Sequence, residues 1–194
     1  MKHNLSDITS LIKDRRTIYP EQYTERKVHR EIVEDVLKNA IWAPTHGKTE
    51  PWRFQVFLSE DSREKLSEFQ SKWYNDNTTE ETFNQMKFNK LKNRPLMSSV
   101  VIAVNMIPDP KGRISEIDEI SAVSCAVQNM YLTATAYGIG GFWATPKIIY
   151  TDEFKAFLGI EKNDKCLGLF YMGYPSIDWP KGHRKPIEYV TQWQ

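Results

Sequence analysis

The chain has 194 residues, of which 40% are hydrophobic and 26% charged, and its formal net charge is +1. This length suits one folded domain with its own core, and the composition is close to that of soluble globular proteins. Proteins that bind nucleic acids usually carry a clear basic excess, and that class is disfavoured here. We therefore expect one domain over residues 1–194, without a nucleic-acid partner.

The sequence also argues against a membrane protein. Its longest apolar-rich stretch, residues 120–137, is interrupted by serine, glutamine and asparagine, and residues 1–13 lack the apolar run of a signal peptide. Cys125 and Cys166 lie far apart in apolar stretches, a pattern typical of buried thiols in a reducing compartment. We expect a cytoplasmic protein that makes no membrane contact.

The first part of the chain predicts two helices, a loop and a strand. Ser6 and Asp7 are suited to cap a short helix that ends near residue 14. Apolar residues then recur at helical spacing over 30–41. Residues 43–51 form a loop because prolines near both of its ends disfavour regular structure. Residues 53–58 follow as a strand.

The middle of the chain predicts two more helices, over 61–73 and 79–93, and a buried strand over 99–106 that is dense in β-branched residues. A long helix over about 118–137 should follow and end at Gly138, a residue that commonly terminates helices. This helix carries small and apolar residues on most faces. We therefore expect it at the centre of the molecule.

The last part predicts a glycine-rich turn that leads into a strand, a short helix over 152–158 and a core strand over 166–173. From residue 174 onward the tail is rich in proline, tryptophan and charge, and it has no pattern that would fold alone. We expect the tail to lie on another surface, such as a partner subunit. Helices and strands mix without a strict βαβ rhythm, which favours an α+β fold.

Several common chemical motifs are absent from the sequence. There is no phosphate-binding GxxxxGK[ST], no GxGxxG after a strand and no GxSxG. The four histidines are scattered, and none has metal-ligand spacing with cysteines or carboxylates. We therefore predict no metal site, and difficult chemistry would require a bound organic cofactor.

Three separated segments together resemble the nitroreductase family. Arg15-Arg16-Thr17 looks like the family's Arg-Arg-Ser signature after the first helix, and residues 43–54 are similar to its loop ending in Gln-Pro-Trp-x-Phe. Residues 138–145 follow a long helix, as in the family, and are joined by the strand end 171–175 and the tail sequence Arg184-Lys185-Pro186. The order and the spacing of the segments match, and the resemblance covers nearly the whole chain.

The resemblance implies a three-layer α/β/α sandwich around a mixed, mostly antiparallel sheet, and an intertwined homodimer with FMN bound at its interface by both subunits. It also implies electron transfer from NADH or NADPH through FMN to a small-molecule acceptor such as a nitroaromatic or a quinone. The flavin carries the chemistry, so no catalytic side chain is expected. The expected cofactor-binding residues are Arg15, Arg16, Thr17, Trp42, Pro44, Thr45, His46, Gly141, Trp143, Ala144, Thr145 and Arg184.

Arginines suit the phosphate end of FMN because a guanidinium fork matches phosphate oxygens. We assign this role to Arg15 and Arg184, give Thr17 a hydroxyl contact and place Arg16 at the ring or the ribityl chain. From the residues alone, the Arg15–Arg16 pair would be a solvated basic pair after a helix, and the charged tail would simply be hydrated.

The other two segments would contact the flavin ring. Pro44 and Thr45 would present backbone atoms and His46 a side-chain donor, although a loop histidine can equally point to water. Around Gly141 and Thr145, backbone amides would lie beside flavin N5. Taken alone, this stretch is a tight turn followed by an ordinary buried strand.

The chain departs from the family pattern in four places. Glu50 replaces the usual glutamine and Lys48 a frequent asparagine, and Tyr19 stands where some larger members carry a lysine. Pro146 has no N–H, so Thr145 would have to supply the donor to flavin N5. These departures predict altered contacts at the pyrimidine end of the flavin and a shifted flavin potential.

Two other functions remain open at this point. The chain could be a dimer that binds or stores FMN with little turnover, its flavin face covered by aromatic side chains. It could also be a flavin enzyme of the same fold with other chemistry, such as a reductive dehalogenase. Trp73, Tyr74, Phe83 and Phe88 are candidates for a lid over the acceptor, although ordinary helix packing explains each of them equally well.

Overall fold

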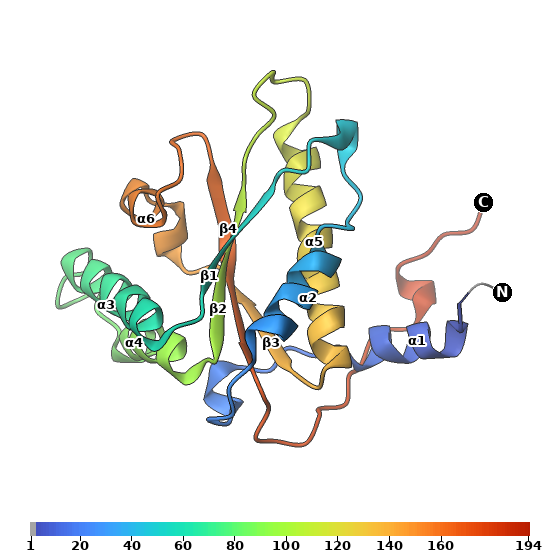
Figure 1. Ribbon diagram of the computed structural model, residues 1–194, viewed down its shortest axis with the longest axis horizontal. Coiled ribbons are helices and arrows are strands. Elements are labelled where there is room, and N and C mark those ends of the chain that lie inside the picture. The colour runs from blue at the N-terminus through green and yellow to red at the C-terminus, as the bar shows by residue number, and fades with distance from the viewer. Residues whose placement is uncertain (1–2) are drawn as a thin grey trace.

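The structure is a computed structural model that describes residues 3–194, and it shows an α+β fold in which helices cover both faces of one sheet (Figure 1). The sheet contains β1 (Trp52–Phe57), β2 (Val100–Met106), β3 (Gly140–Ala144) and β4 (Lys165–Gly173) in the order β1-β2-β4-β3. All neighbouring strands run antiparallel. The mostly antiparallel character of the predicted sheet is confirmed, but a mixed sheet is not, because no two of these four strands pair in parallel. The parallel pairing of Thr17 with Gly141 is an isolated bridge outside the strands.

The helices divide between the two faces of the sheet, as predicted for a three-layer sandwich. One layer holds α2 (Arg30–Ala40) and α5 (Glu116–Ala136). The opposite layer holds α3 (Glu60–Asp76), α4 (Gln85–Met97) and α6 (Asp152–Leu158). Their connections include short 3-10 turns at Pro20–Gln22, His46–Lys48, Lys147–Tyr150 and Ile187–Tyr189.

Strand β2 explains why both faces need a cover. All seven of its residues are buried. Val100, Ile102, Val104 and Met106 belong to the core shared with α2 and α5, whereas Val101 and Ala103 belong to the core on the α3 and α6 side. A strand between two helical layers has no solvent-facing side, so its sequence is apolar apart from the buried Asn105.

Two predicted helix starts are wrong. The first helix, α1 (Leu5–Asp14), is capped by Asn4, whose side-chain oxygen accepts a hydrogen bond from the Ser6 N–H at 3.0 Å. The predicted helix over 79–93 is displaced toward the C-terminus, because residues 79–83 form a turn and Asn84 caps α4. That helix continues through Pro95, which lies in its last turn.

The prediction for the two thiols is half right. Cys166 is buried in β4, and burial raises the pKa of its thiol to about 12. Cys125, in contrast, is exposed on the outer face of α5, because only one side of this helix packs against the sheet and α2. Within residues 3–194, no helix is long and apolar enough to cross a membrane.

The two ends of the chain project together from the main body. Figure 1 shows α1 and the C-terminal tail extending away from the sheet on the side of α5. None of the residues of α1 is buried, and its Leu5, Ile8 and Ile12 are 63%, 44% and 52% exposed. Trp193 in the tail is 88% exposed. Both ends therefore present apolar side chains that the described part of this chain does not cover.

Candidate functional site

Arginines from opposite ends of the chain meet in one cleft. Arg15 and Arg16 follow directly after α1, and Arg184 lies in the tail. They line a cavity of about 540 Å³ together with Gly182 and His183, and we call this cavity the arginine cleft. Three guanidinium groups at one cavity form a strongly cationic site that suits a phosphate.

The tail reaches this place because it is tied to the end of α1. The Arg16 Nε–H donates to the Pro180 carbonyl at 3.1 Å, and the Trp179 indole N–H donates to the Asp14 carbonyl. Gly182 allows the tail to lie directly on Arg16, since a Cβ at this position would come within 1.7 Å of the Arg16 guanidinium. Arg16 is therefore a clamp on the tail, and its contact with the ring or ribityl chain stays a prediction.

The segment after α1 also docks onto β3, which joins the first and third predicted segments. Thr17 pairs with Gly141 in a parallel bridge, and the Ile18 N–H donates to the Gly141 carbonyl at 3.1 Å. Arg15 lies with its guanidinium carbon 5.1 Å from the centre of the Tyr131 ring. Tyr131 was missed by the sequence reasoning, because a tyrosine in a long apolar helix gives no signal beyond packing.

Tyr131 links the arginine cleft to the strand edge. Its hydroxyl accepts a hydrogen bond from the Trp143 backbone N–H at 2.8 Å, and burial raises the pKa of this phenol. Since β3 is an edge strand, the Trp143 N–H points away from β4 toward the open edge. Thr145, the first residue after β3, is exposed, and Pro146 follows it without an N–H.

Two glycines of the sheet allow aromatic side chains to pack directly against its backbone. A Cβ on Gly141 would lie 2.8 Å from the Phe170 ring and 3.1 Å from the Tyr131 ring. A Cβ on Gly168, which has φ +148°, would lie 2.1 Å from the Trp143 indole nitrogen. The Trp143 indole thus packs against bare backbone, and its buried N–H has no hydrogen-bond acceptor among the described residues.

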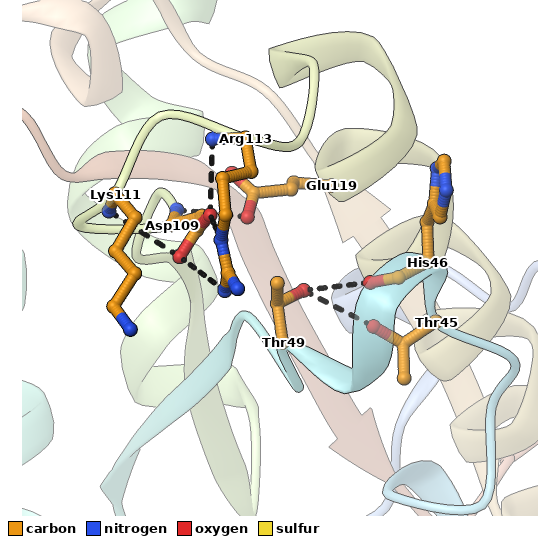
Figure 2. A network of polar contacts seen from close by, with 7 residues as sticks. All are labelled: Thr45, His46, Thr49, Asp109, Lys111, Arg113 and Glu119. Carbon is orange, nitrogen blue, oxygen red and sulfur yellow. Dashed lines mark hydrogen bonds and ion pairs between the residues drawn. The ribbon is translucent and has the colours of Figure 1, made fainter.

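The segment 43–51, which we call the proline loop, is held by bonds within itself. Thr45 Oγ1 lies 3.2 Å from Thr49 Oγ1 and accepts a hydrogen bond from the Glu50 N–H at 3.3 Å. Figure 2 shows Thr45, His46 and Thr49 around this turn. Lys48 and Glu50 adopt positive φ angles of 55° and 47°, which side-chain-bearing residues rarely do. The loop is rigid and locally strained.

His46 is the one side chain of this loop with an ionic partner in the described structure. Its Nδ1 lies 3.3 Å from Asp118 Oδ2 near the start of α5. The same carboxylate oxygen accepts from the Ser115 hydroxyl at 2.8 Å. These two contacts, first that of Ser115 and then that of His46, lower the pKa of Asp118. Asp118 was also missed, because an acidic residue in the first turn of a helix is normally a capping residue.

A second charged network lies beside the loop (Figure 2). Asp109 accepts hydrogen bonds from Arg113 Nε and from the Arg113 backbone N–H, both at 3.0 Å. The Asp109 N–H donates to the buried Glu119 carboxylate at 2.8 Å. Ile114, in the turn between these residues, contacts Gly47 of the proline loop. The network therefore braces the turn on which the loop lies.

Comparison with known proteins identifies the family of this chain. The model of the nitroreductase family matches residues 12–174, which include the segment after α1, the proline loop and β3. The chain belongs to the nitroreductase family.

Individual relatives cover almost the whole chain. The Bacillus subtilis (strain 168) protein named "Putative NAD(P)H nitroreductase YfhC" is 31% identical over 95% of this chain and 93% of its own length. A nitroreductase-like family protein from Bacillus cereus is 27% identical, with a TM-score of 0.81 over 100% of this chain and 98% of its own. The FMN-dependent nitroreductase NfnB from Mycobacterium smegmatis, in complex with NADPH, is 19% identical, with a TM-score of 0.76 over 98% and 100%.

Within one chain of this nitroreductase-family protein, the predicted site residues form two separate groups. Arg15, Thr17 and Trp143 gather around Tyr131, whereas the proline loop lies beside Asp118. At about 1.5 Å of rise per residue, Asp118 and Tyr131 are roughly 20 Å apart along α5. Of the other predicted cofactor-binding residues, Trp42 is 84% exposed, Pro44 and Thr145 are also exposed, and Ala144 is half-buried in β3.

Three of the four candidates for a lid, Tyr74, Phe83 and Phe88, pack on one another, whereas Trp73 packs against the core on the α3 and α6 side of the sheet. The Tyr74 and Phe83 ring centres are 5.5 Å apart, and those of Phe83 and Phe88 are 5.7 Å apart. The Tyr74 hydroxyl accepts from the Asn84 N–H at 3.0 Å, which fixes the turn between α3 and α4. These contacts explain the residues as packing within the α3–α4 hairpin, and a lid role stays a prediction.

Arg94, on α4, places a positive charge close to Tyr19, the position at which some larger members of the family carry a lysine. Its guanidinium carbon lies 4.8 Å from the centre of the Phe142 ring and 5.7 Å from that of Tyr19. Its Nε donates to Glu21 at 2.9 Å. Neither residue had a sequence signal, since the pairing depends on two segments 73 positions apart.

Proposed function

We propose that the chain is an FMN-dependent NAD(P)H oxidoreductase that works as a homodimer and reduces an electron-poor acceptor such as a nitroaromatic or a quinone. The observation that carries the proposal is the arginine cleft, where Arg15, Arg16 and Arg184 meet next to the open edge of β3. Membership of the nitroreductase family supports it, as does the FMN dependence named for the Mycobacterium smegmatis relative.

The residues present fit FMN in charge and shape. Arg15 and Arg184 would hold the phosphate, with the Thr17 hydroxyl as a further donor. The exposed Thr145, directly after the edge strand β3, would present its N–H to the flavin ring. When bound, FMN supplies a centre that accepts a hydride from NADH or NADPH and passes two electrons on to the acceptor.

A homodimer would complete the site. The two groups of site residues lie at opposite ends of α5 in one chain, so Pro44, Thr45 and His46 would serve the partner's arginine cleft. The helix α1 supports this assembly because it has an apolar stripe and no buried residue. An isolated helix of this length is marginal in water unless tertiary or quaternary packing covers it. Trp42 is 84% exposed and would be covered in the same way.

The chain's own residues would bind and orient the reactants without forming a covalent bond to them. One pocket beside β3 would receive the reduced nicotinamide and, after its departure, the acceptor. Because donor and acceptor would use the same place in turn, the steady-state kinetics should be ping-pong. Selection of the acceptor would then depend on the shape of the pocket.

The absorption spectrum of the purified protein tests this proposal. We expect a yellow protein whose oxidised-flavin bands bleach with anaerobic NADPH or NADH and return with a quinone or a nitroaromatic. Sedimentation analysis should show a dimer. A colourless protein that takes up no added FMN would overturn the cofactor assignment. A yellow protein that neither donor bleaches would instead support FMN storage.

A further inference from the structure

We propose that His46 donates a proton to the acceptor during its reduction and that Asp118 is the positioning residue that orients the imidazole for this step. The inference rests on the proposed function, since it assigns a role in the same site. It adds a proton-transfer group to a reaction in which the cofactor alone was expected to carry the chemistry.

The geometry fixes which ring nitrogen is available. Asp118 has a pKa below its usual range, because Ser115 and His46 both contact the carboxylate, and it is therefore ionised near neutral pH. An ionised carboxylate can only accept hydrogen bonds. The His46 Nδ1, 3.3 Å away, must then carry the hydrogen of this contact. Nε2 is left on the other side of the ring, and the side chain is 64% exposed in the single chain.

The proline loop fixes the backbone that carries His46. Gly47 lies against Ile114, so that a Cβ at this position would come 2.8 Å from the Ile114 side chain. The Thr49 hydroxyl lies 3.4 Å from the His46 carbonyl and 3.2 Å from the Thr45 hydroxyl. A histidine that merely pointed to water would need neither this brace nor a carboxylate partner. The restraint suits a group that must meet a reactant in one orientation.

The proton balance of the reaction requires such a group. A quinone becomes a hydroquinone by gaining two electrons and two protons. A hydride that originates from NAD(P)H brings both electrons and one of the protons. The second proton would leave the Nε2–H of the His46 imidazolium and form the second O–H bond of the hydroquinone, and the neutral imidazole would then regain a proton from water.

The sequence offers one natural control. Histidine is the side chain whose ordinary pKa allows proton transfer near neutral pH. His29, the residue before α2, is exposed, and its side chain makes no capping hydrogen bond. The charged group in contact with His46 is Asp118 on α5, and Lys48 and Glu50 follow two and four positions later in its own loop. His29→Gln therefore removes a histidine that belongs neither to the arginine cleft nor to this dyad.

Two acceptors separate proton transfer from electron transfer. The protein is loaded with FMN, reduced with NADPH and mixed in a stopped-flow instrument with a quinone or with ferricyanide, which accepts electrons without a proton. We expect His46→Gln to slow reoxidation by the quinone by about tenfold or more and to leave reoxidation by ferricyanide unchanged. His29→Gln should leave both rates unchanged.

A second measurement tests the orientation without turnover. Nitrogen-15 NMR of the FMN-bound protein should show the neutral His46 ring with its hydrogen on Nδ1. Asp118→Asn should remove this preference and slow only the quinone reaction, whereas Asp118→Glu should restore part of both. A neutral His46 ring with its single hydrogen on Nε2 in the unaltered protein would overturn the assignment of Asp118.

A second variant tests His46 in case His46→Gln disturbs the proline loop. His46→Asn keeps a donor that can reach Asp118 but has no group at the Nε2 position. Equal quinone rates for His46→Asn and the unaltered protein would overturn proton donation by His46. A parallel loss of the quinone and ferricyanide rates in both variants would also overturn it. Failure of the proposed function is seen separately, as a protein that binds no FMN or that NADPH does not bleach.

Discussion

The arginine cleft and the proline loop contrast in how each is prepared for a ligand. The cleft brings the half-buried Arg15 and Arg16 together with the exposed Arg184, and a few hydrogen bonds hold the tail on one side of it. The proline loop is held by internal hydrogen bonds between uncharged groups, and its backbone is strained at Lys48 and Glu50. One region is rich in charge and loosely held, and the other is rigid.

Because of this contrast, we expect salt and substitutions to affect the two halves of the proposed site differently. Attraction between a phosphate and exposed guanidinium groups is long-ranged and is screened by salt. A rigid loop instead reduces the entropy lost on binding, and this contribution does not depend on ionic strength. We therefore expect substitutions in the cleft to change ligand affinity and substitutions in the loop to change stability.

The largest expected effect is at Arg15. Arg15→Gln removes a charged donor from the phosphate site, and hydrogen bonds to charged groups contribute about 1.5–3 kcal/mol. The dissociation constant for FMN, measured by quenching of flavin fluorescence, should therefore rise about 10- to 100-fold. The affinity of the unaltered protein should also fall with added salt, and less steeply in the variant.

Arg184→Gln and Lys185→Gln provide the matched comparison, because both side chains are exposed in the same tail. Arg184 lines the arginine cleft, and the residues that line this cleft do not include Lys185. We expect a weaker affinity for Arg184→Gln and an unchanged one for Lys185→Gln. Equal affinities for FMN in all three variants and the unaltered protein would remove the cleft from the site.

The next effect tests how loosely the cleft is held. Gly182→Ala places a Cβ against the Arg16 guanidinium, whose flexible end can move away. The move costs the Arg16–Pro180 hydrogen bond, about 0.5–1.5 kcal/mol. The affinity for FMN should fall about two- to tenfold, while thermal unfolding of the body changes little. Lys181→Ala is the control, and a large loss of stability in Gly182→Ala alone would show that the tail is part of the core.

The sequence predicted best those elements whose pattern depends on their own residues. The buried run of β2 and the helical spacing of α2 are confirmed with ends within one or two residues, and α6 matches fully. The signals there are β-branched residues in a short apolar run and apolar positions on one helix face. The grouping of Arg15 with Arg184 followed from the family resemblance, since no local pattern joins the two ends of a chain.

The sequence predicted least well what depends on contacts between distant segments. The start of α4 was missed because Thr79 and Thr82 bond to each other in a turn that a polar helix pattern conceals. Tyr131 and Asp118 were missed because their partners come from β3 and the proline loop. When the role of a residue depends on a partner far along the chain, the sequence around that residue contains no signal of the role.

A smaller effect is expected from relieving the strain in the proline loop. Lys48 has a φ of 55°, and a left-handed backbone costs most residues about 1–2 kcal/mol, whereas asparagine adopts it readily. Lys48→Asn should therefore raise the free energy of unfolding by about 0.5–1 kcal/mol, or the melting temperature by about 1–4 °C. Lys38→Asn, an exposed helical substitution, is the control. A destabilised Lys48→Asn variant would mean that the lysine side chain holds the loop.

The smallest effect concerns the network that braces the loop. Hydrogen bonds from the Arg113 side chain, together with backbone N–H groups, hold the pKa of Asp109 below its usual range. Because the folded pKa is below the unfolded value of about 3.9, this stabilisation is present above about pH 4 and is lost as the pH falls through the folded pKa. Urea unfolding between about pH 5 and 3 should show a shallower loss of stability in Asp109→Asn than in the unaltered protein. Asp61→Asn, which removes an exposed partner of Lys65, should keep the full slope. If Asp109→Asn also kept the full slope of stability against pH, packing against Ile114 rather than charge would hold the proline loop in place. Electrostatics would then contribute nothing to the stability of this rigid half of the site.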